Sequence, residues 1–130
     1  MTYPPRVGAV LFAKDLEQVA TFYSRMLGLA EATRDNAHIR LESLAFELVV
    51  HRLTHGGGPA RDIDGPLARR AAAAFKPVFF VPSISSLRDV AESCGGLMEP
   101  VDREWSFNGT TVCDGIDPEG NVIQFREQPR

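Results

Sequence analysis

Apolar and polar positions alternate with different periods along the chain, and each change of period predicts an element. A short apolar stretch over 7–13 precedes Asp15, and apolar residues then recur at helical spacing from Leu16 to Met26. Asp15 belongs to the residue types that cap helix N-termini, and Gly28 to the type that ends helices in the left-handed conformation. This stretch therefore predicts a strand followed by a helix that ends at Gly28.

The same pattern recurs at an offset of 68 residues, which carries Asp15 onto Ser83 and Gly28 onto Gly96. A second apolar strand is expected over 77–81, and the helix that follows has apolar residues at Ile84, Leu87, Val90, Ala91 and Cys94. An offset that holds over strand, cap, helix and stop predicts a duplicated β-α unit.

Short strands are expected after each helix. They cover 31–34, 37–41 and 44–52 in the first copy, and 97–101, 110–116 and 121–127 in the second. Asp117-Pro118-Glu119-Gly120 predicts the turn between the last two strands. We therefore predict one α+β domain over 1–130, with module one over 6–52, a linker over 53–75 and module two over 76–128. A glycine-rich stretch over 56–59 and a short helix over 66–75 are expected within the linker.

This tandem of β-α-β-β-β modules resembles the vicinal oxygen chelate superfamily, which includes glyoxalase I, bleomycin-resistance proteins and extradiol dioxygenases. The stretches 10–17, 22–29 and 117–125 are similar to the family's opening strand and helix, its "FY…LG" signature and its closing "DP-x-GN" hairpin. The resemblance implies curved mixed sheets around a cavity. It also implies a homodimer, because family proteins this short usually complete their cavities by pairing modules between chains.

Composition narrows the class of protein. The 130 residues carry a net charge of −3, which argues against a nucleic-acid surface, and no apolar run has the length of a membrane span. Cys94 and Cys113 lie in apolar settings and indicate reduced thiols. We expect a cytoplasmic protein with no nucleic-acid or membrane partner.

Strand alternation predicts which side chains share the sheet face opposite the helices. The polar ones are Glu47, His51, Lys76, Gln124 and Arg126, and the apolar ones are Val10, Phe12, Val49, Val78 and Phe80. An apolar wall with a few convergent polar groups is typical of a small-molecule site.

Metal-dependent members of the family bind a divalent cation on this face, and the resemblance places their ligands at Gly8, Glu47, Lys76 and Gln124. Glycine has no side-chain donor, an ammonium has no lone pair, and glutamine is a weak oxygen donor where glutamate is usual. We therefore expect no metal cofactor, with a relocated site around Glu47, His51 and Gln124 as the open alternative. Lys76, with Arg126, is instead expected to hold an anionic or carbonyl group of a ligand, with Glu47 balancing the charge.

Several of these residues have more than one interpretation. Glu47 is either a carboxylate paired across the sheet with Lys76 or Arg126, or a ligand contact or general base, or a metal ligand. His51 is a substrate contact or base, or a partly exposed packing residue. Trp105 either stacks on an aromatic ligand at one end of the cavity or belongs to a core or dimer interface.

Other chemistry-bearing residues are given structural interpretations. Cys94 is expected to fill the core, and Cys113 has no neighbouring base that would make it a nucleophile. His38 is assigned to a strand surface and His55 to the glycine-rich loop. Arg69-Arg70 is assigned to the solvated side of the short linker helix.

The favoured function is a metal-independent small-molecule-binding protein of the bleomycin-resistance type. It would sequester a partly apolar ligand with a polar or anionic group. Phe12, Phe80 and Trp105 would hold the apolar part, with Lys76, Glu47 and His51 for polar contacts. The alternative is a glyoxalase- or dioxygenase-like enzyme (lyase, isomerase or oxygenase) with a degenerate or relocated metal site, using Glu47 or His51 as base. A purely structural interaction module is the third interpretation.

Overall fold

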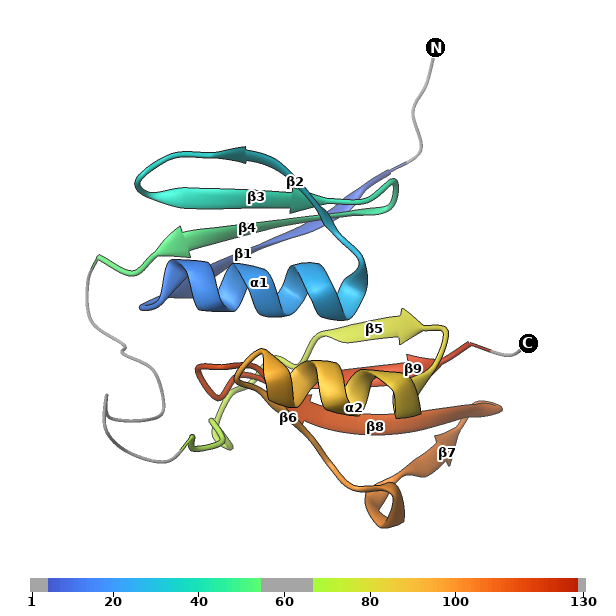
Figure 1. Ribbon diagram of the computed structural model, residues 1–130. Coiled ribbons are helices and arrows are strands. Elements are labelled where there is room, and N and C mark those ends of the chain that lie inside the picture. Colours follow the sequence, from blue (N-terminus) through green and yellow to red (C-terminus); the bar gives the residue numbers. More distant parts are fainter. Residues whose placement is uncertain (1–4, 55–66, 129–130) are drawn as a thin grey trace. The chain divides into compact units, whose positions relative to one another are not determined.

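The computed structural model describes residues 5–54 and 67–128 and divides the chain into two compact units, Met1–Gly58 and Pro59–Arg130 (Figure 1). The boundary between the units falls within 53–75, the segment predicted as linker. In each unit one long helix covers one face of a mixed sheet. Among the helices in the described ranges, none is long and apolar enough to cross a membrane.

The first unit contains β1 (Val7–Ala13), α1 (Leu16–Leu27), β2 (Ala30–Arg34), β3 (His38–Glu42) and β4 (Phe46–Arg52). Its sheet has the order β1-β4-β3-β2, with β1 parallel to β4 and the other pairs antiparallel. The apolar stripe of α1 packs on β3 and β4. The buried side chains at this interface include Val19, Phe22, Met26, Ile39, Leu41, Leu48 and Val50.

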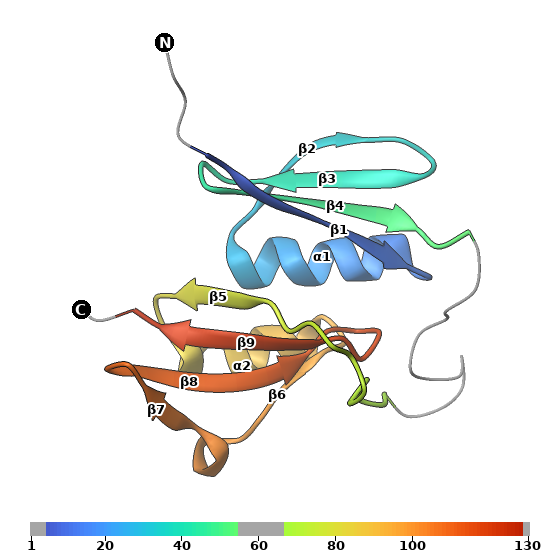
Figure 2. The same cartoon turned by 180° about the vertical axis from the view of Figure 1, so that it is seen from behind.

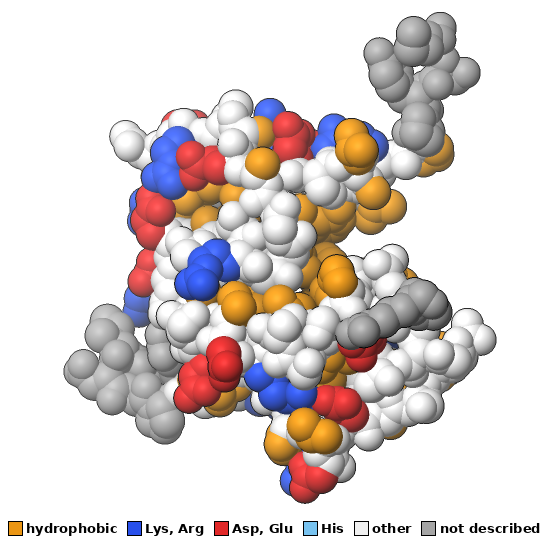
Figure 3. All heavy atoms as spheres, turned by 45° about the vertical axis from the view of Figure 1, so that its right-hand side comes forward, with side chains coloured by type: hydrophobic (Ala, Val, Ile, Leu, Met, Phe, Trp, Pro, Cys, Tyr) orange, Lys and Arg blue, Asp and Glu red, His pale blue; other side chains and the backbone are white. Residues whose placement is uncertain are grey.

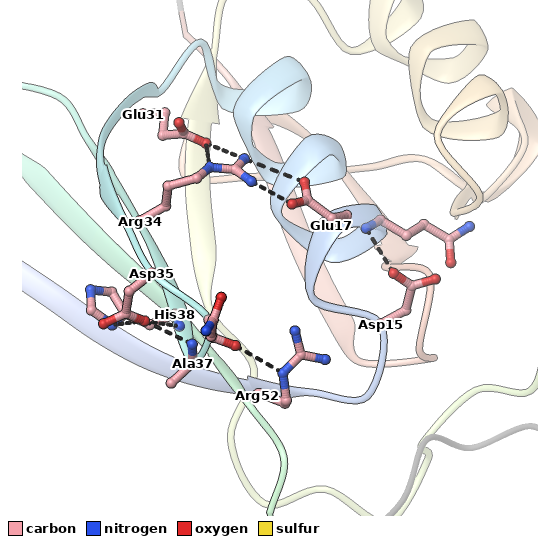
Figure 4. A network of polar contacts seen from close by, with 10 residues as sticks. Asp15, Glu17, Glu31, Arg34, Asp35, Ala37, His38 and Arg52 are labelled. Atoms are coloured by element: carbon pink, nitrogen blue, oxygen red, sulfur yellow. Dashed lines mark hydrogen bonds and ion pairs between the residues drawn. The ribbon is translucent and has the colours of Figure 1, made fainter.

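Both predicted ends of α1 are confirmed. The Asp15 carboxylate accepts the Gln18 backbone N–H at 3.1 Å, and Gly28 takes the left-handed conformation with φ 66°. At the exposed side of the unit, the Arg34 guanidinium contacts Glu17 at 2.5 Å and Glu31 at 2.6 Å (Figure 4). Arg34 thus joins the end of β2 to the first turn of α1.

The turn between β2 and β3 is an Asx turn. Asp35 Oδ1 accepts the backbone N–H groups of Ala37 at 2.7 Å and His38 at 2.9 Å (Figure 4). These two N–H donors, with His38 also nearby, hold the pKa of Asp35 below its ordinary value. The gap between the strands expected over 31–34 and 37–41 is therefore a turn that the Asp35 carboxylate holds in place.

The second unit contains β5 (Val78–Val81), α2 (Ile84–Ser93), β6 (Leu97–Met98), the 3₁₀ turn η1 (Val101–Arg103), β7 (Trp105–Phe107), β8 (Thr110–Ile116) and β9 (Val122–Glu127). The sheet order is β5-β9-β8-β6, and β7 also pairs with β8. β5 runs parallel to β9, and the other pairs are antiparallel. Figure 2 shows β8 and β9 in front of α2, so the sheet face seen there is the one without a helix.

Two local predictions for this unit are wrong, and one strand was not predicted. The strand expected over 97–101 ends at Met98, and η1 and the unpredicted strand β7 follow. The left-handed glycine after α2 is Gly95, with φ 88°, and not Gly96. Because two glycines stand in succession, the first can already take the left-handed conformation, and α2 ends at Ser93.

The short helix expected over 66–75 does not form. Residues 67–75 contain only a turn and a bend, and the remainder of that range lies outside the described residues. An isolated helix of about ten residues is only marginally stable in water, because nucleation is costly and most helical stability comes from packing against the rest of the protein. Instead, the Arg70 backbone N–H donates to Gly120 O at 2.9 Å and its Nε donates to Glu119 O at 3.1 Å. Arg70 therefore fixes this segment to the β8–β9 turn rather than lying on the solvated side of a helix.

The predicted β8–β9 turn is confirmed. Asp117 is fully buried, and its carboxylate accepts from the backbone N–H groups of Glu119 and Asn121 and from Asn121 Nδ2, at 2.9–3.0 Å. Gly120 supplies the positive φ of 85°. The turn fixes the register between the two central strands of the second unit, which carry the site described next.

Candidate functional site

The helix-free face of the second sheet carries two rows of side chains, which follow from the strand register. Val78, Gln124 and Asp114 lie opposite one another on β5, β9 and β8. In the next row on this face, Phe80, Arg126, Val112 and Trp105 lie on β5, β9, β8 and β7. Since residues in register point to the same side of a sheet, one polar row lies beside one largely apolar row.

The polar groups of this face form a continuous chain of contacts. Arg126 Nε donates to Gln124 Oε1 at 2.9 Å, and Gln124 Nε2 donates to Asp114 Oδ1 at 3.3 Å. Asp114 is ion-paired with Lys76 Nζ at 3.1 Å and lies 3.7 Å from a terminal nitrogen of Arg69. We call these five residues the unit-two polar chain.

Burial sets the electrostatics of the unit-two polar chain. The side chain of Asp114 is 12% exposed and that of Lys76 is 39% exposed. A carboxylate this well covered needs compensating donors, and here three side chains supply them. The chain of contacts therefore gives the Asp114 carboxylate its hydrogen-bonding and ionic partners, and the cationic partners are more exposed than the carboxylate itself.

Aromatic rings border the unit-two polar chain. The Arg126 guanidinium carbon lies 4.7 Å from the ring centre of Phe107 and 5.8 Å from that of Phe80. Both rings and Trp105 are exposed, Trp105 by 41%, so Trp105 is not a core residue of its unit. Apolar side chains reach the molecular surface elsewhere too, as Figure 3 shows for one side of the molecule. What distinguishes these three is their place beside a charged group.

The helix-free face of the first sheet is built differently. Register places Gly8, Glu47 and Glu42 in one row, and Val10, Val49 and Arg40 in the next. The Glu47 carboxylate lies 3.6 Å from Arg40 and 3.9 Å from Arg6. Both guanidiniums also contact Glu42, at 2.9 Å and 3.4 Å. Two carboxylates thus share two guanidiniums, which leaves this cluster close to neutral.

A third row of the first sheet contains Phe12, His51 and His38. The rings of Phe12 and His51 are tilted, with centres 5.5 Å apart. His51 Nδ1 lies 2.9 Å from the Arg52 carbonyl oxygen, and His38 Nδ1 lies 3.0 Å from Asp35 Oδ1. His38, assigned to a strand surface, lies on β3 and shares a sheet face with His51. His55, assigned to the glycine-rich loop, lies outside the described residues.

The structure thus distributes the predicted site residues over two sheets. Glu47, His51 and Phe12 lie on the first, and Phe80, Trp105, Gln124 and Arg126 lie on the second, with Lys76 just before β5. The expected pairing of Glu47 across one sheet with Lys76 or Arg126 is therefore wrong. Its ion-pair partners are Arg6 and Arg40, because these flank it on its own sheet.

Sequence reasoning missed three functional candidates on the second unit. Asp114 lies on the same side of β8 as Val112 and Ile116, so the alternation of side chains along this strand could have placed it on the helix-free face. Arg69 was assigned to a helix that does not form. Phe107 was also missed, since a three-residue strand is too short to show a period.

The two cysteines lie inside the second unit. Both are buried, which confirms Cys94 as core filler. The Cys113 thiol is 3.6 Å from an Arg88 nitrogen, which favours the thiolate, but burial has the larger effect and raises the pKa of this thiol. Arg88 is held by Glu104 and by the Glu99 carbonyl oxygen, and thus joins α2 to the segment before β7.

The positions that the resemblance assigns to metal ligands do not fit a divalent cation here. Gly8 has no side chain, and a Cβ built on it would lie 3.1 Å from the Glu47 carbonyl oxygen. The Lys76 ammonium is a donor that is bound to Asp114, and Gln124 Oε1 already accepts from Arg126. Within 5–54 and 67–128, no three His, Cys, Asp or Glu side chains are grouped as metal ligands would be.

No protein-family model matches the sequence, and no curated protein matches it. Solved structures match over nearly the whole chain. A glyoxalase/bleomycin resistance protein from Albidiferax ferrireducens T118 is 17% identical with a TM-score of 0.62, covering 95% of this chain and 98% of that one. The bleomycin-binding protein of Streptomyces verticillus, solved with copper(II)-bleomycin, is 18% identical with a TM-score of 0.58, covering 99% and 100%. Oxidase ChaP-H2 is 15% identical with a TM-score of 0.66, covering 98% and 96%.

The chain has the vicinal oxygen chelate fold. The fold predicted from the repeat and the closing hairpin is thereby confirmed. Identities this low show the fold alone, and the matched proteins include both a binding protein and an oxidase. The function of this protein must therefore be argued from its own side chains.

Proposed function

We propose that this protein is a metal-independent small-molecule-binding protein that sequesters a partly apolar ligand carrying a polar or anionic group. The observation that carries the proposal is the unit-two polar chain, bordered by exposed aromatic rings on a sheet face without a helix. The polar side chains already hold one another in place, so ordering them costs a ligand little conformational entropy. The bleomycin-binding neighbour supports small-molecule binding by this fold.

The glyoxalase- or dioxygenase-like alternative is less well supported, because the residues at the expected metal-ligand positions are poor ligands for a divalent cation. Such an enzyme would polarise an oxygen of its substrate with a divalent cation. Gly8 and Lys76 supply no lone pair, and the carboxylate of Glu47 is engaged by two guanidiniums. We propose that no divalent metal is a resident cofactor, and that the cationic groups of the protein itself face the ligand.

Metal content and metal titration test this part of the proposal. The purified protein should contain no stoichiometric metal. After chelation, its melting temperature should not respond to Mn(II), Fe(II), Co(II), Ni(II) or Zn(II). A cation bound to the folded state at 100 times its Kd would add about 2.7 kcal/mol, which such a titration detects. One bound metal per chain with a clear shift would overturn the proposal and favour an enzyme with a relocated site around Glu47, His51 and Gln124.

A thermal-shift screen of aromatic acids, phenols and neutral aromatics tests the binding itself. Compounds that raise the melting temperature should lose affinity in Lys76→Met. The matched control is Lys14→Met, because Lys14 is the other lysine of the chain and belongs to the first unit. Unchanged affinity in both variants would contradict a role for Lys76, and the absence of any stabilising compound would contradict the proposed function.

We further propose a homodimer, since exposed aromatic faces of this kind are often covered in an assembly. Light scattering coupled to size-exclusion chromatography should give twice the chain mass. A mass that stays at that of one chain at high micromolar concentration would contradict dimerisation.

A further inference from the structure

The side chain of Arg126 is held in place by one hydrogen bond and by two aromatic rings. Its Nε donates to Gln124 Oε1 at 2.9 Å, and the rings of Phe107 and Phe80 lie against its guanidinium. In the part of the chain that the structure describes, its two terminal nitrogens donate to no side chain or carbonyl. Guanidinium is planar and presents its terminal N–H groups as a pair, which matches the two oxygens of a carboxylate. The fixed orientation directs this pair away from Gln124.

The charged side chains of this face leave one positive charge without a compensating carboxylate. Lys76 and Arg69 are both within ion-pair distance of Asp114, and Arg69 also lies 3.4 Å from Glu99. These two cations and two carboxylates balance, and Arg126 is left as a single positive charge. A carboxylate neutralises it, whereas a phosphate dianion would bring a second negative charge toward Asp114.

The aromatic rings beside Arg126 indicate the chemistry of the apolar part of the ligand. Phe80, Phe107 and Trp105 are all exposed, and Trp105 lies in the same cross-strand row as Arg126. Exposed flat rings pack most favourably against another flat ring, in offset-stacked or edge-to-face arrangements. The apolar part of the ligand should therefore be aromatic rather than an alkyl chain.

We propose that this face binds a flat aromatic monocarboxylate, with the carboxylate on the terminal nitrogens of Arg126 and the ring against the aromatic side chains beside it. This inference rests on the proposed small-molecule-binding function and adds the chemical class of the ligand. It also makes Arg126, more than Lys76, the group that recognises the anion.

Calorimetry with three probes that share a naphthalene ring tests the proposal: 2-naphthoate, 2-naphthamide and 2-naphthyl phosphate. The acid should bind at least about tenfold more tightly than the neutral amide and than the dianionic phosphate. Arg126→Gln should remove this preference, and Arg126→Lys should retain part of it, because an ammonium keeps the charge but loses the paired N–H geometry. The matched control is Arg103→Gln, an exposed arginine of η1 in the same unit, which should bind as the unchanged protein does.

Phe107→Leu keeps the guanidinium and removes one ring, so it should weaken binding of both the acid and the amide. Circular dichroism shows whether each variant is folded. Equal affinities for acid and amide, or an acid preference that survives Arg126→Gln, would overturn the ligand class while leaving small-molecule binding intact. If none of the three probes binds, the ligand class is overturned, and the broader thermal-shift screen decides the proposed function separately.

Discussion

Removing the Asp117 carboxylate should destabilise the second unit more than any other single loss of a carboxylate in the β8–β9 region. This carboxylate is fully buried and accepts three hydrogen bonds, two from backbone N–H groups and one from the Asn121 side chain. Asp117→Ala leaves all three donors without this acceptor. Asp117→Asn keeps an oxygen for the backbone donors but places an amide NH₂ opposite the Asn121 amide.

The magnitude follows from the hydrogen bonds. A bond to a charged group contributes about 1.5–3 kcal/mol, and the three bonds share one acceptor group, so their contributions do not simply add. We expect Asp117→Ala to lower the free energy of unfolding by about 3–4 kcal/mol and Asp117→Asn by about 1–2 kcal/mol. For a unit of this size the larger change lowers the melting temperature by more than about 10 °C.

Urea unfolding measures this change. The chain contains one tryptophan, and Trp105 lies in the second unit, so its fluorescence reports on the unit that is perturbed. The matched control is Asp102→Ala, an exposed aspartate of η1, which should change the free energy of unfolding by less than about 0.5 kcal/mol. Equal urea midpoints for Asp117→Ala and Asp102→Ala would refute the reasoning and would mean that Pro118 and Gly120 alone determine the turn.

Three further predictions concern single features. Because burial raises the pKa of Cys113, its thiol stabilises the fold fully below its ordinary pKa of 9.0. The urea midpoint should therefore fall as pH rises above that value, and neither Cys113 nor Cys94 should react rapidly with a disulfide reagent at pH 8 before unfolding. Gly28→Ala should cost about 1 kcal/mol by denaturant unfolding, because φ is 66° there, and a cost near zero would contradict a left-handed cap. The Arg34 side chain holds the pKa of Glu31 below 4.5, so carboxyl NMR should give a midpoint below that value which rises in Arg34→Met, and an unchanged midpoint would contradict the contact.

Elements with strong local signals were predictable from the sequence. The bounds of β1 and β8, both ends of α1 and the Asp117 turn follow from period, capping residues and turn chemistry, and the structure has them at those positions. β7 has three residues, all of them exposed, so it shows no alternation of buried and exposed positions from which it could be predicted. Its existence depends on pairing with β8, which is a tertiary property.

The candidate site was predictable as a sheet face but not as a set of contacts. Alternation placed Gln124 and Arg126 on the face shared with Phe80, and the register confirms this. It could not pair Lys76 with Asp114, because these residues are 38 positions apart in the sequence and their contact depends on strand register and side-chain rotamers. Glu47 was assigned partners from the other module because the two modules were treated as one continuous face.

The contacts of this chain also indicate that no single substitution would create a metal site at the positions that the resemblance assigns to metal ligands. A ligand side chain at position 8 would begin with a Cβ 3.1 Å from the Glu47 carbonyl oxygen. A histidine in place of Lys76 would remove the closest cation of a carboxylate that is mostly buried. A glutamate in place of Gln124 would put a second carboxylate against Asp114, where an amide N–H now donates at 3.3 Å. At Lys76 and Gln124, each step toward a metal site is therefore expected to cost stability before any cation is bound, which agrees with the proposal that this face recognises an organic anion through Arg126.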